Sequence, residues 1–218
     1  MIELPDFKNS FHYENMFYLS CDATRIEKIL TQHHIFELSV PIEGAIIECG
    51  VLKGSSLSRY SMFREIHNIT NKRLIGFDSF GMFPETNHLE DMELRQEFID
   101  FDGEEGISKE QLELVLNNKN TTNFNLVKGD ICHTVPLYVK DNPDLVISFI
   151  NLDVDIYEPS SVVLEYLYPK LSHGGVLLLD NYNEFPGETK AVNDYCRDHG
   201  ISIKKFGINK KLHYIIKD

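Results

Sequence analysis

Several features that mark particular classes of protein are missing from this sequence of 218 residues. No apolar stretch approaches the ~20 residues that a membrane-spanning helix needs, and the opening segment MIELPD lacks the basic and apolar regions of a signal peptide. Clusters of Lys and Arg are also missing, and the formal net charge is -13, which argues against a nucleic-acid partner. We therefore expect a cytoplasmic protein that binds neither membranes nor nucleic acid.

The four cysteines and nine histidines show no spacing typical of a disulfide framework or a zinc site. The cysteines form no C-x-x-C pair, so reduced thiols are expected. The histidines form no H-x-x-x-H motif and no matching Cys/His pattern. The sequence therefore predicts no zinc site.

Linkers rich in Pro, Gly or Ser, internal repeats and low-complexity tracts are also absent, which favours a single domain overall. We expect a helical N-terminal segment over 1–43 and an α/β domain over 44–218. The segment 82–106 is long and charged and follows the second expected strand, so it is a candidate lid. A surface insertion that only covers the sheet is an equal alternative for this segment.

From residue 44 onward the hydrophobic pattern alternates between strand and helix periodicity. Such alternation builds a mostly parallel, doubly wound sheet covered by helices on both faces. The last two strands, joined through 207–211, suggest one antiparallel strand near the C-terminus. Strands are expected at 45–49, 73–78, 124–128, 145–152, 176–180, 201–206 and 212–216, and helices at 55–66, 88–100, 108–117, 159–169 and 188–199.

Two apolar, strand-like runs end in acidic residues. One leads into Asp153 and Asp155, and the other into Asp180 and Asn181. Carboxylates are costly in such runs unless they lie just beyond the sheet, in the crevice where open α/β sheets bind ligands. Asp153 and Asp155 share a face if the strand stays extended, and Asp180 lies close if its strand is the neighbour. Hard oxygen ligands of this kind suit Mg²⁺; ordinary solvated loop acids are the alternative.

The turns after the first three expected strands carry a second signal. Glu48 and Gly50 lie in a turn with two glycines, where a ligand can approach the backbone and an acid suits a cationic amino-acid group. Asp78 is placed to accept the hydroxyls of a ribose, and Asp130 could accept from an adenine amino group. Each position also has an ordinary loop explanation, but their order predicts S-adenosylmethionine as a cofactor.

Five segments carry a resemblance to a known family. They are the E-x-G-V-x-K-G-S turn at 48–55, G-F-D-S-F at 76–80, L-D-x-D-x-Y-E-P at 152–159, L-Y-P-K-L-x-x-G-G-V at 167–176 and D-N-Y at 180–182. Together they resemble the macrocin O-methyltransferase family of Mg²⁺-dependent sugar O-methyltransferases. The resemblance implies a class I Rossmann-like methyltransferase fold with seven strands in the order 3-2-1-4-5-7-6, a lid and a homo-oligomer.

The resemblance also implies roles for individual residues. It places metal ligands at Asp153, Asp180 and Asn181 and a general base at Asp155. Family members often have a second Asp at the position of Asn181, and the residues after Phe80 depart from the usual x-G-L-P, so the shape of that loop is open. The residues implied to contact S-adenosylmethionine are Glu48, Gly50, Ser55, Asp78, Ser79 and Asp130.

The implied reaction is methylation of a sugar hydroxyl, with coordination to Mg²⁺ stabilising the developing alkoxide and Asp155 taking the proton. Two alternatives remain open at this stage. A catechol-type enzyme acting on an aromatic diol would use the same cofactor and metal, and Asn181 fits that arrangement. A nicotinamide-dependent oxidoreductase acting on a nucleotide sugar is disfavoured, because the sequence has no G-x-G-x-x-G turn.

Overall fold

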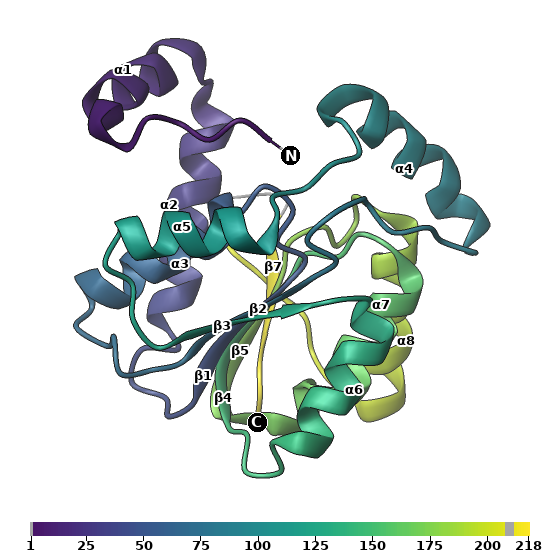
Figure 1. Cartoon of the computed structure of the whole chain (residues 1–218). Coiled ribbons are helices and arrows are strands. Elements are labelled where there is room, and N and C mark those ends of the chain that lie inside the picture. Colours follow the sequence, from purple (N-terminus) through teal and green to yellow (C-terminus); the bar gives the residue numbers. More distant parts are fainter. Residues whose placement is uncertain (1, 208–211) are drawn as a thin grey trace.

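A computed structural model describes residues 2–207 and 212–218. In this part of the chain, seven strands form one sheet in the predicted order β3-β2-β1-β4-β5-β7-β6 (Figure 1). The pairs among β1 to β5 are parallel, whereas β7 runs antiparallel to both of its neighbours. The strands are β1 (Ala45–Cys49), β2 (Leu74–Asp78), β3 (Phe124–Lys128), β4 (Ile147–Leu152), β5 (Leu171–Leu179), β6 (Lys204–Lys205) and β7 (His213–Ile216).

Two strands differ clearly from their predicted ranges. β5 begins at Leu171, five residues before the predicted start, because Leu171 already pairs with Ile147. The register then shifts, and residues 172–175 of β5 include two glycines that resemble a turn in the sequence. The strand predicted at 201–206 is reduced to β6, the two residues that pair with β7. Residues 208–211 of the predicted connection lie outside the described part of the chain.

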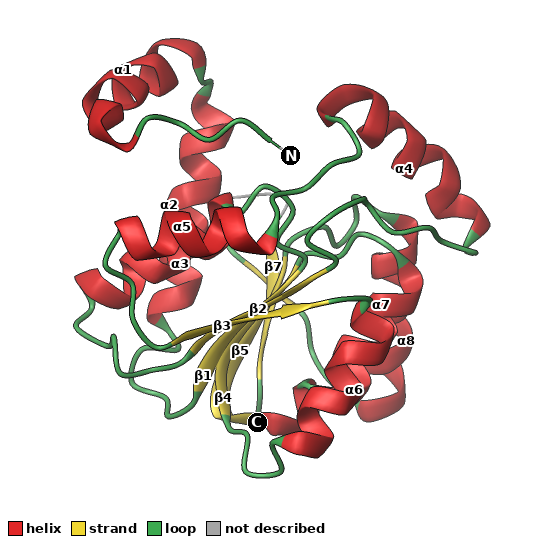
Figure 2. Cartoon of the chain, viewed as in Figure 1, coloured by secondary structure: helices red, strands yellow, loops and turns green. Residues whose placement is uncertain are grey.

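Helices cover both faces of the sheet, as predicted (Figure 2). Ile46 of β1 packs in one hydrophobic cluster with Tyr60 of α3, and the next residue, Ile47, packs in a second cluster with Val163 of α7. Successive residues of the central strand therefore feed two separate cores. The helices are α1 (Ser10–Ser20), α2 (Ala23–Glu37), α3 (Ser55–Ile66), α4 (Leu89–Asp102), α5 (Lys109–Asn118), α6 (Ile131–Asp141), α7 (Tyr157–Tyr166) and α8 (Pro186–His199), with short 3-10 turns at Phe7–Asn9 and Tyr168–Lys170.

The N-terminal helices are attached to the sheet unequally. α1 contains no buried residue and stands away from the sheet (Figure 1). α2 contributes Ile35 and Phe36 to the core shared with α3 and α5. The division of the chain at residue 44 stays a prediction. In the ranges 2–207 and 212–218, no helix is both long and apolar enough to cross a membrane.

The segment 82–106 leaves the sheet and returns to nearly the same place. Met82 and Glu105 form a β-bridge at its base, and the Gly106 N–H donates to the Gly81 carbonyl at 2.8 Å. Its helix, α4, begins and ends within two residues of the predicted helix. Its buried residue is an acid, Asp91, while Phe101 is 89% exposed.

Candidate active site

A cavity of about 890 Å³ lies at the carboxyl ends of the parallel strands. Its volume is within the range of pockets that bind small molecules, ~300–1,000 Å³. Its wall combines α2, the turn after β1, the segment 82–106 and the loops after β2, β4 and β5. The site residues predicted from the sequence that line it are Gly50, Ser55, Asp78, Ser79, Asp130, Asp153, Asp155, Asp180 and Asn181. Glu48 does not line it.

The structure brings the four residues after β4 and β5 together. The two strands are parallel neighbours and pair up to the residues just before Asp153 and Asp180, as the sequence suggested. The side-chain nitrogen of Asn181 donates to Asp153 Oδ1 at 2.8 Å and to Asp155 Oδ1. The acids therefore meet at one edge of the sheet because parallel strands end there together.

The reason for the proximity of Asp153 and Asp155 differs from the prediction. β4 ends at Leu152, and Asp155 adopts a left-handed backbone conformation with φ +64°. The Ile156 N–H donates to the Val154 carbonyl at 2.6 Å, closing a tight turn. The strand does not stay extended, so the turn, rather than the alternation of a strand, directs both carboxylates to Asn181. Asp tolerates this backbone region better than most residues.

The acidic side chains of this cluster are too close together for all of them to ionise easily. Burial, followed by the negative charge of Asp180, holds the pKa of Asp153 well above its usual range and raises the pKa of Asp155 to about 7. Glu188 is fully buried beside them and accepts the Asn181 backbone N–H at 3.1 Å. Burial and the charges of Asp155 and Asp180 raise the pKa of Glu188 as well. An added positive charge would relieve this repulsion.

Helix α2 supplies contacts that sequence reasoning missed. Lys28 Nζ donates to Asp180 Oδ2 at 2.6 Å, and Gln32 Nε2 donates to Asp180 Oδ1 at 3.1 Å. Arg59 Nε in turn donates to Gln32 Oε1 at 3.0 Å. The sequence did contain a signal for these contacts. Arg25, which also lines the cavity, precedes Lys28 and Gln32 by three and seven residues, so the three polar side chains lie on one face of the helix.

The donors present fit a hard divalent cation after local adjustment. Carboxylate and amide oxygens are the ligands that Mg²⁺ prefers. Asn181 presents its nitrogen to the acids, so the amide must turn over to offer Oδ1. Lys28 must also release the Asp180 oxygen to which it donates. Among the described residues, 2–207 and 212–218, one group of His and acidic side chains already has its ligand atoms within 4.8 Å of one another. This group lies elsewhere in the fold and consists of His33, Glu37 and His67.

The turn after β1 is shaped by close backbone contacts. Gly50 has φ +87°, and a Cβ there would lie 1.7 Å from the Asp153 carbonyl oxygen, so no other residue fits. Asp78 Oδ2 accepts from the N–H groups of Val51 and Leu52 at 2.7 and 3.1 Å, and its Oδ1 accepts from the Phe80 N–H at 2.6 Å. In this structure Asp78 organises the turn. A ribose that binds Asp78 would either share its carboxylate with these backbone N–H groups or displace them.

Three other predicted cofactor residues occupy different settings. Asp130 caps α6 by accepting from the Cys132 N–H at 2.8 Å, and it pairs with His133. Partial burial opposes its ionisation, but these two hydrogen bonds outweigh burial and lower the pKa of Asp130. Ser79 donates to the Met82 carbonyl at 2.9 Å, and Ser55 is the first residue of α3.

Glu48 lies beneath the cavity, in the middle of the sheet. It is 0% exposed, and one of its oxygens accepts from Asn151 Nδ2 at 2.9 Å. Burial raises the pKa of Glu48 to about 8. The carboxyl group is therefore mainly neutral at pH 7 in the free protein, so its predicted contact with a cationic group of the cofactor requires both access and ionisation.

The raised pKa of Glu48 predicts a pH-dependent loss of stability. Folded Glu48 keeps its proton up to about pH 8, whereas the unfolded side chain loses it near its ordinary pKa of 4.5. Stability is therefore complete below pH 4.5 and falls as the pH rises towards 8. Glu48→Gln is expected to remove this loss, on the order of 3 kcal/mol at pH 7, as measured by urea unfolding at several pH values. The exposed Glu43→Gln is the control, and parallel pH profiles for the two variants would refute the expectation.

The segment 82–106 is held down by residues next to the acid cluster. Asp91 of α4 is 0% exposed and accepts the N–H of Gly187 at 2.7 Å and that of Tyr157 at 3.1 Å, so one carboxylate caps the first turns of α8 and α7. Glu158 accepts from Thr86 Oγ1 and from a backbone N–H at 3.0 Å each. The L-D-x-D-x-Y-E-P motif therefore combines the acids with the anchor points of this segment.

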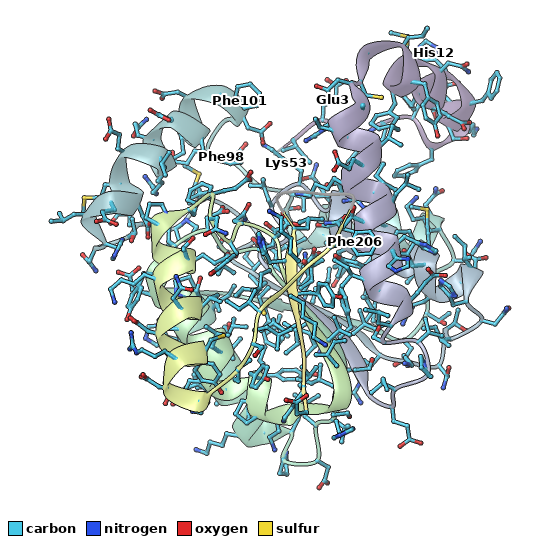
Figure 3. All side chains as sticks on the ribbon, turned by 180° about the vertical axis from the view of Figure 1, so that it is seen from behind. Glu3, His12, Lys53, Phe98, Phe101 and Phe206 are labelled. Atoms are coloured by element: carbon cyan, nitrogen blue, oxygen red, sulfur yellow. The ribbon has the colours of Figure 1, made fainter. Side chains whose placement is uncertain are left out.

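The far end of the same segment is tied to the turn after β1. Lys53 Nζ donates to the carbonyl oxygens of Glu105 and Asp102 at 2.6 and 3.2 Å. Figure 3 shows Phe98 and Phe101 of α4 near Lys53, and both rings line the cavity. The segment therefore contributes aromatic surface to a cavity whose floor is acidic.

Loss of Asp91 is expected to release the segment. Asp91→Ala leaves the Gly187 and Tyr157 N–H groups without their buried acceptor, which costs about 2–3 kcal/mol in the free energy of unfolding. Hydrogen exchange of residues 82–106 should rise before that of β1 and β4. The exposed Glu93→Ala on the same helix is the control, and equal exchange in both variants would show that Asp91 does not anchor the segment.

Comparison with known sequences finds relatives of this chain among O-methyltransferases. The family model described as Macrocin-O-methyltransferase (TylF) matches residues 25–215. A tetracenomycin rhamnosyl 4'-O-methyltransferase of Streptomyces olivaceus is 30% identical over 168 residues, which cover 74% of this chain and 61% of that protein. Mycinamicin III 3''-O-methyltransferase of Micromonospora griseorubida is 25% identical over 184 residues, which cover 79% and 68% of the two chains.

Solved structures support the fold. The calicheamicin methyltransferase CalS11 superimposes with a TM-score of 0.80 at 24% identity, over 95% of this chain and 85% of that chain. The O-methyltransferase NovP superimposes with a TM-score of 0.74 at 20% identity, over 88% and 80%. The predicted class I methyltransferase fold is confirmed. Since the family model spans nearly the whole of the Rossmann-like sheet and its site loops, the chain belongs to the macrocin O-methyltransferase family.

Proposed function

We propose that this protein transfers the methyl group of S-adenosylmethionine to a hydroxyl group of a sugar, with the help of Mg²⁺. The observation that carries the proposal is the convergence of Asp153, Asp155, Asp180 and Asn181 in one cavity at the ends of β4 and β5. Family membership supports the reaction type. The proposed metal ligands are Asp153, Asp180 and Asn181, and the proposed general base is Asp155.

The proposed cofactor contacts line the same cavity, at the ends of β1, β2 and β3. The turn at Gly50 and Ser55, the loop at Asp78 and Ser79, and the start of α6 at Asp130 all line it. Gly50 lets a ligand approach the backbone closely. The acids at the strand ends give this region a negative field, which suits a sulfonium cation with an α-amino group. Glu48, which is buried beneath the cavity, would contact the cationic amino-acid group of the cofactor from below.

The chain's own residues have definable tasks in this reaction. Asp155 receives the proton of the attacking hydroxyl; it lies beside Asn181, whose amide donates to its carboxylate in this structure. Mg²⁺, when bound, would stabilise negative charge on the hydroxyl oxygen. We propose that the segment 82–106 acts as a lid, anchored by Asp91, that excludes water and places Phe98 and Phe101 against the substrates.

The sugar assignment rests on what the relatives act on. One is named as the 4'-O-methyltransferase of a dimethoxy-rhamnosyl tetracenomycin, and another as the 3''-O-methyltransferase of mycinamicin III. A vicinal diol of a sugar would offer two oxygens to one cation and so orient one of them for attack. We propose a sugar-containing small molecule as the acceptor, whether a nucleotide sugar, a glycoside or a polysaccharide precursor.

A catechol or another aromatic diol is the second candidate, because Asn181 stands where family members often have a second acid. A transfer assay with radiolabelled S-adenosylmethionine against nucleotide sugars, antibiotic glycosides and catechols tests both. Methylation of a sugar acceptor in the presence of Mg²⁺ is the expected result. Catechol methylation without any sugar product would favour the second candidate, and the absence of methyl transfer to the whole panel would count against both.

The cytoplasmic location, the homo-oligomeric state and the absence of a nucleic-acid partner also remain predictions. Analytical ultracentrifugation at several protein concentrations tests the oligomeric state. A filter-binding assay with RNA and DNA at low salt tests the last prediction, for which the net charge of -13 is the support.

A further inference from the structure

We propose that His33 and His67, with Glu37, form a second metal site, for a transition-metal cation such as Zn²⁺, that joins α2 to the end of α3. The ligand atoms of these three side chains lie within 4.8 Å of one another. His33 and Glu37 are one turn apart on α2, so they project from the same face of the helix. His67 is the residue that directly follows the last residue of α3.

The two imidazoles already have the spacing of a chelating pair. His33 Nε2 and His67 Nε2 are 3.1 Å apart. Two nitrogens that are each about 2.0–2.1 Å from one tetrahedral zinc ion lie roughly 3.3 Å apart. Without an ion, a single proton between the two nitrogens makes this contact a hydrogen bond. An ion would take the place of that proton and bind the lone pairs of both rings.

Packing holds both rings in this orientation. The His33 ring meets the Phe63 ring edge-on, with 4.8 Å between the ring centroids. The centroids of the His67 and Phe36 rings are 6.1 Å apart. The His67 backbone N–H donates to the Phe63 carbonyl at 3.0 Å, which fixes the end of α3. Both imidazoles are only partly exposed. The pair is therefore preorganised, so little side-chain entropy is lost when an ion binds.

Glu37 supplies an adjustable third ligand. Its Oε2 is 3.8 Å from His33 Nδ1, and its Oε1 is 4.0 Å from His67 Nε2. The Glu37 side chain is 44% exposed and can rotate towards the ion without disturbing the core. Two imidazole nitrogens, one carboxylate and water suit Zn²⁺, Ni²⁺ or Cu²⁺ rather than Mg²⁺. This ligand set differs from the all-oxygen cluster at the strand ends.

The position of the site suggests a structural role. Gln32, which contacts Asp180, is the neighbour of His33 on α2. α1 has no buried residue, whereas α2 contributes Ile35 and Phe36 to the core. An ion shared by α2 and α3 would clamp α2 against the core and stabilise the folded chain. The inference does not depend on the proposed reaction.

Equilibrium dialysis of the untagged full chain against Zn²⁺, at saturating Mg²⁺, tests the site. His33→Gln and His67→Gln are each expected to lose one zinc equivalent, with affinity reduced by at least roughly tenfold. His173→Gln, an exposed histidine of β5, is the matched control and should bind as the original chain does. Zinc should raise the Tm of the original and control proteins by about 5–10 °C and leave the other two unchanged.

A zinc-edge anomalous difference map from a Zn²⁺-soaked crystal of the original chain provides a test without substitution. The expected result is a peak between His33 and His67. A stoichiometry unchanged by both substitutions would overturn the proposal, as would an anomalous map whose peaks lie only at the strand-end acids. Since neither readout involves methyl transfer, failure here is distinguishable from failure of the proposed function.

Discussion

Asp155→Asn is expected to reduce the turnover number for methyl transfer by about 10²–10⁴-fold, the usual contribution of a general base. The substitution keeps the shape of the side chain and an oxygen that can accept from Asn181, so the turn after β4 should be preserved. Binding of S-adenosylmethionine and of Mg²⁺, measured by calorimetry, should change little. The defect should therefore appear in kcat rather than in the binding constants.

Asp144→Asn is the matched control, because Asp144 is an exposed acid shortly before the opposite end of the same strand. Its turnover number should equal that of the original protein. Unchanged turnover of Asp155→Asn, with normal binding of cofactor and metal, would show that another group takes the proton. A loss of folded structure in circular dichroism would call for the same measurement with Asp155→Glu, which keeps the carboxylate and displaces it by one methylene.

Removal of divalent cations is expected to lower methyl transfer by roughly 100-fold or more. Burial and the charge of Asp180 raise the pKa of Asp155 to about 7, so without a cation the base is partly protonated at neutral pH. Chelator treatment followed by dialysis should lower turnover to this extent, and Mg²⁺ should restore it where Na⁺ and K⁺ do not. Chelated protein that methylates as fast as Mg²⁺-supplemented protein would refute the metal assignment.

Two substitutions should move the Mg²⁺ requirement in opposite directions. Asp180→Asn removes a proposed ligand charge and should increase the Mg²⁺ concentration needed for half-maximal turnover. Lys28→Met removes the ammonium that lies 2.6 Å from Asp180 and should decrease it, because a positive charge beside a metal site opposes the cation. Shifts in the same direction for both variants would mean that Lys28 does not compete with the metal.

The fold could be predicted because its signals are local. Residues 176–179 of β5 form a continuous apolar run, and α3 has apolar residues at helical spacing. The start of β5 was missed because its glycines at 174 and 175 resemble a turn, while a register shift against β4 admits them to the strand. Pairing with a neighbouring strand is a property of two segments, and one segment does not encode it.

The acids of the site could be predicted because parallel strands deliver their ends to one edge of the sheet. The partners of those acids could not. Lys28 lies 152 residues from Asp180 in the sequence, and Asp91 lies 96 residues from Gly187. The histidines at 33 and 67 show no metal-binding spacing along the chain, and they meet only because α2 packs beside the end of α3.

The sequence by itself determined the alternation of strands and helices and which acids stand at the strand ends, since these follow from periodicity and from motifs of a few residues. The resemblance that those motifs carry implied the family and the order of the strands. The tertiary structure alone decided that Glu48 is buried beneath the cavity, that Asp78 is occupied by backbone N–H groups and that α2 neutralises Asp180. The physical reason is that burial and electrostatic pairing depend on distances between segments remote in the chain, which only the packed structure establishes.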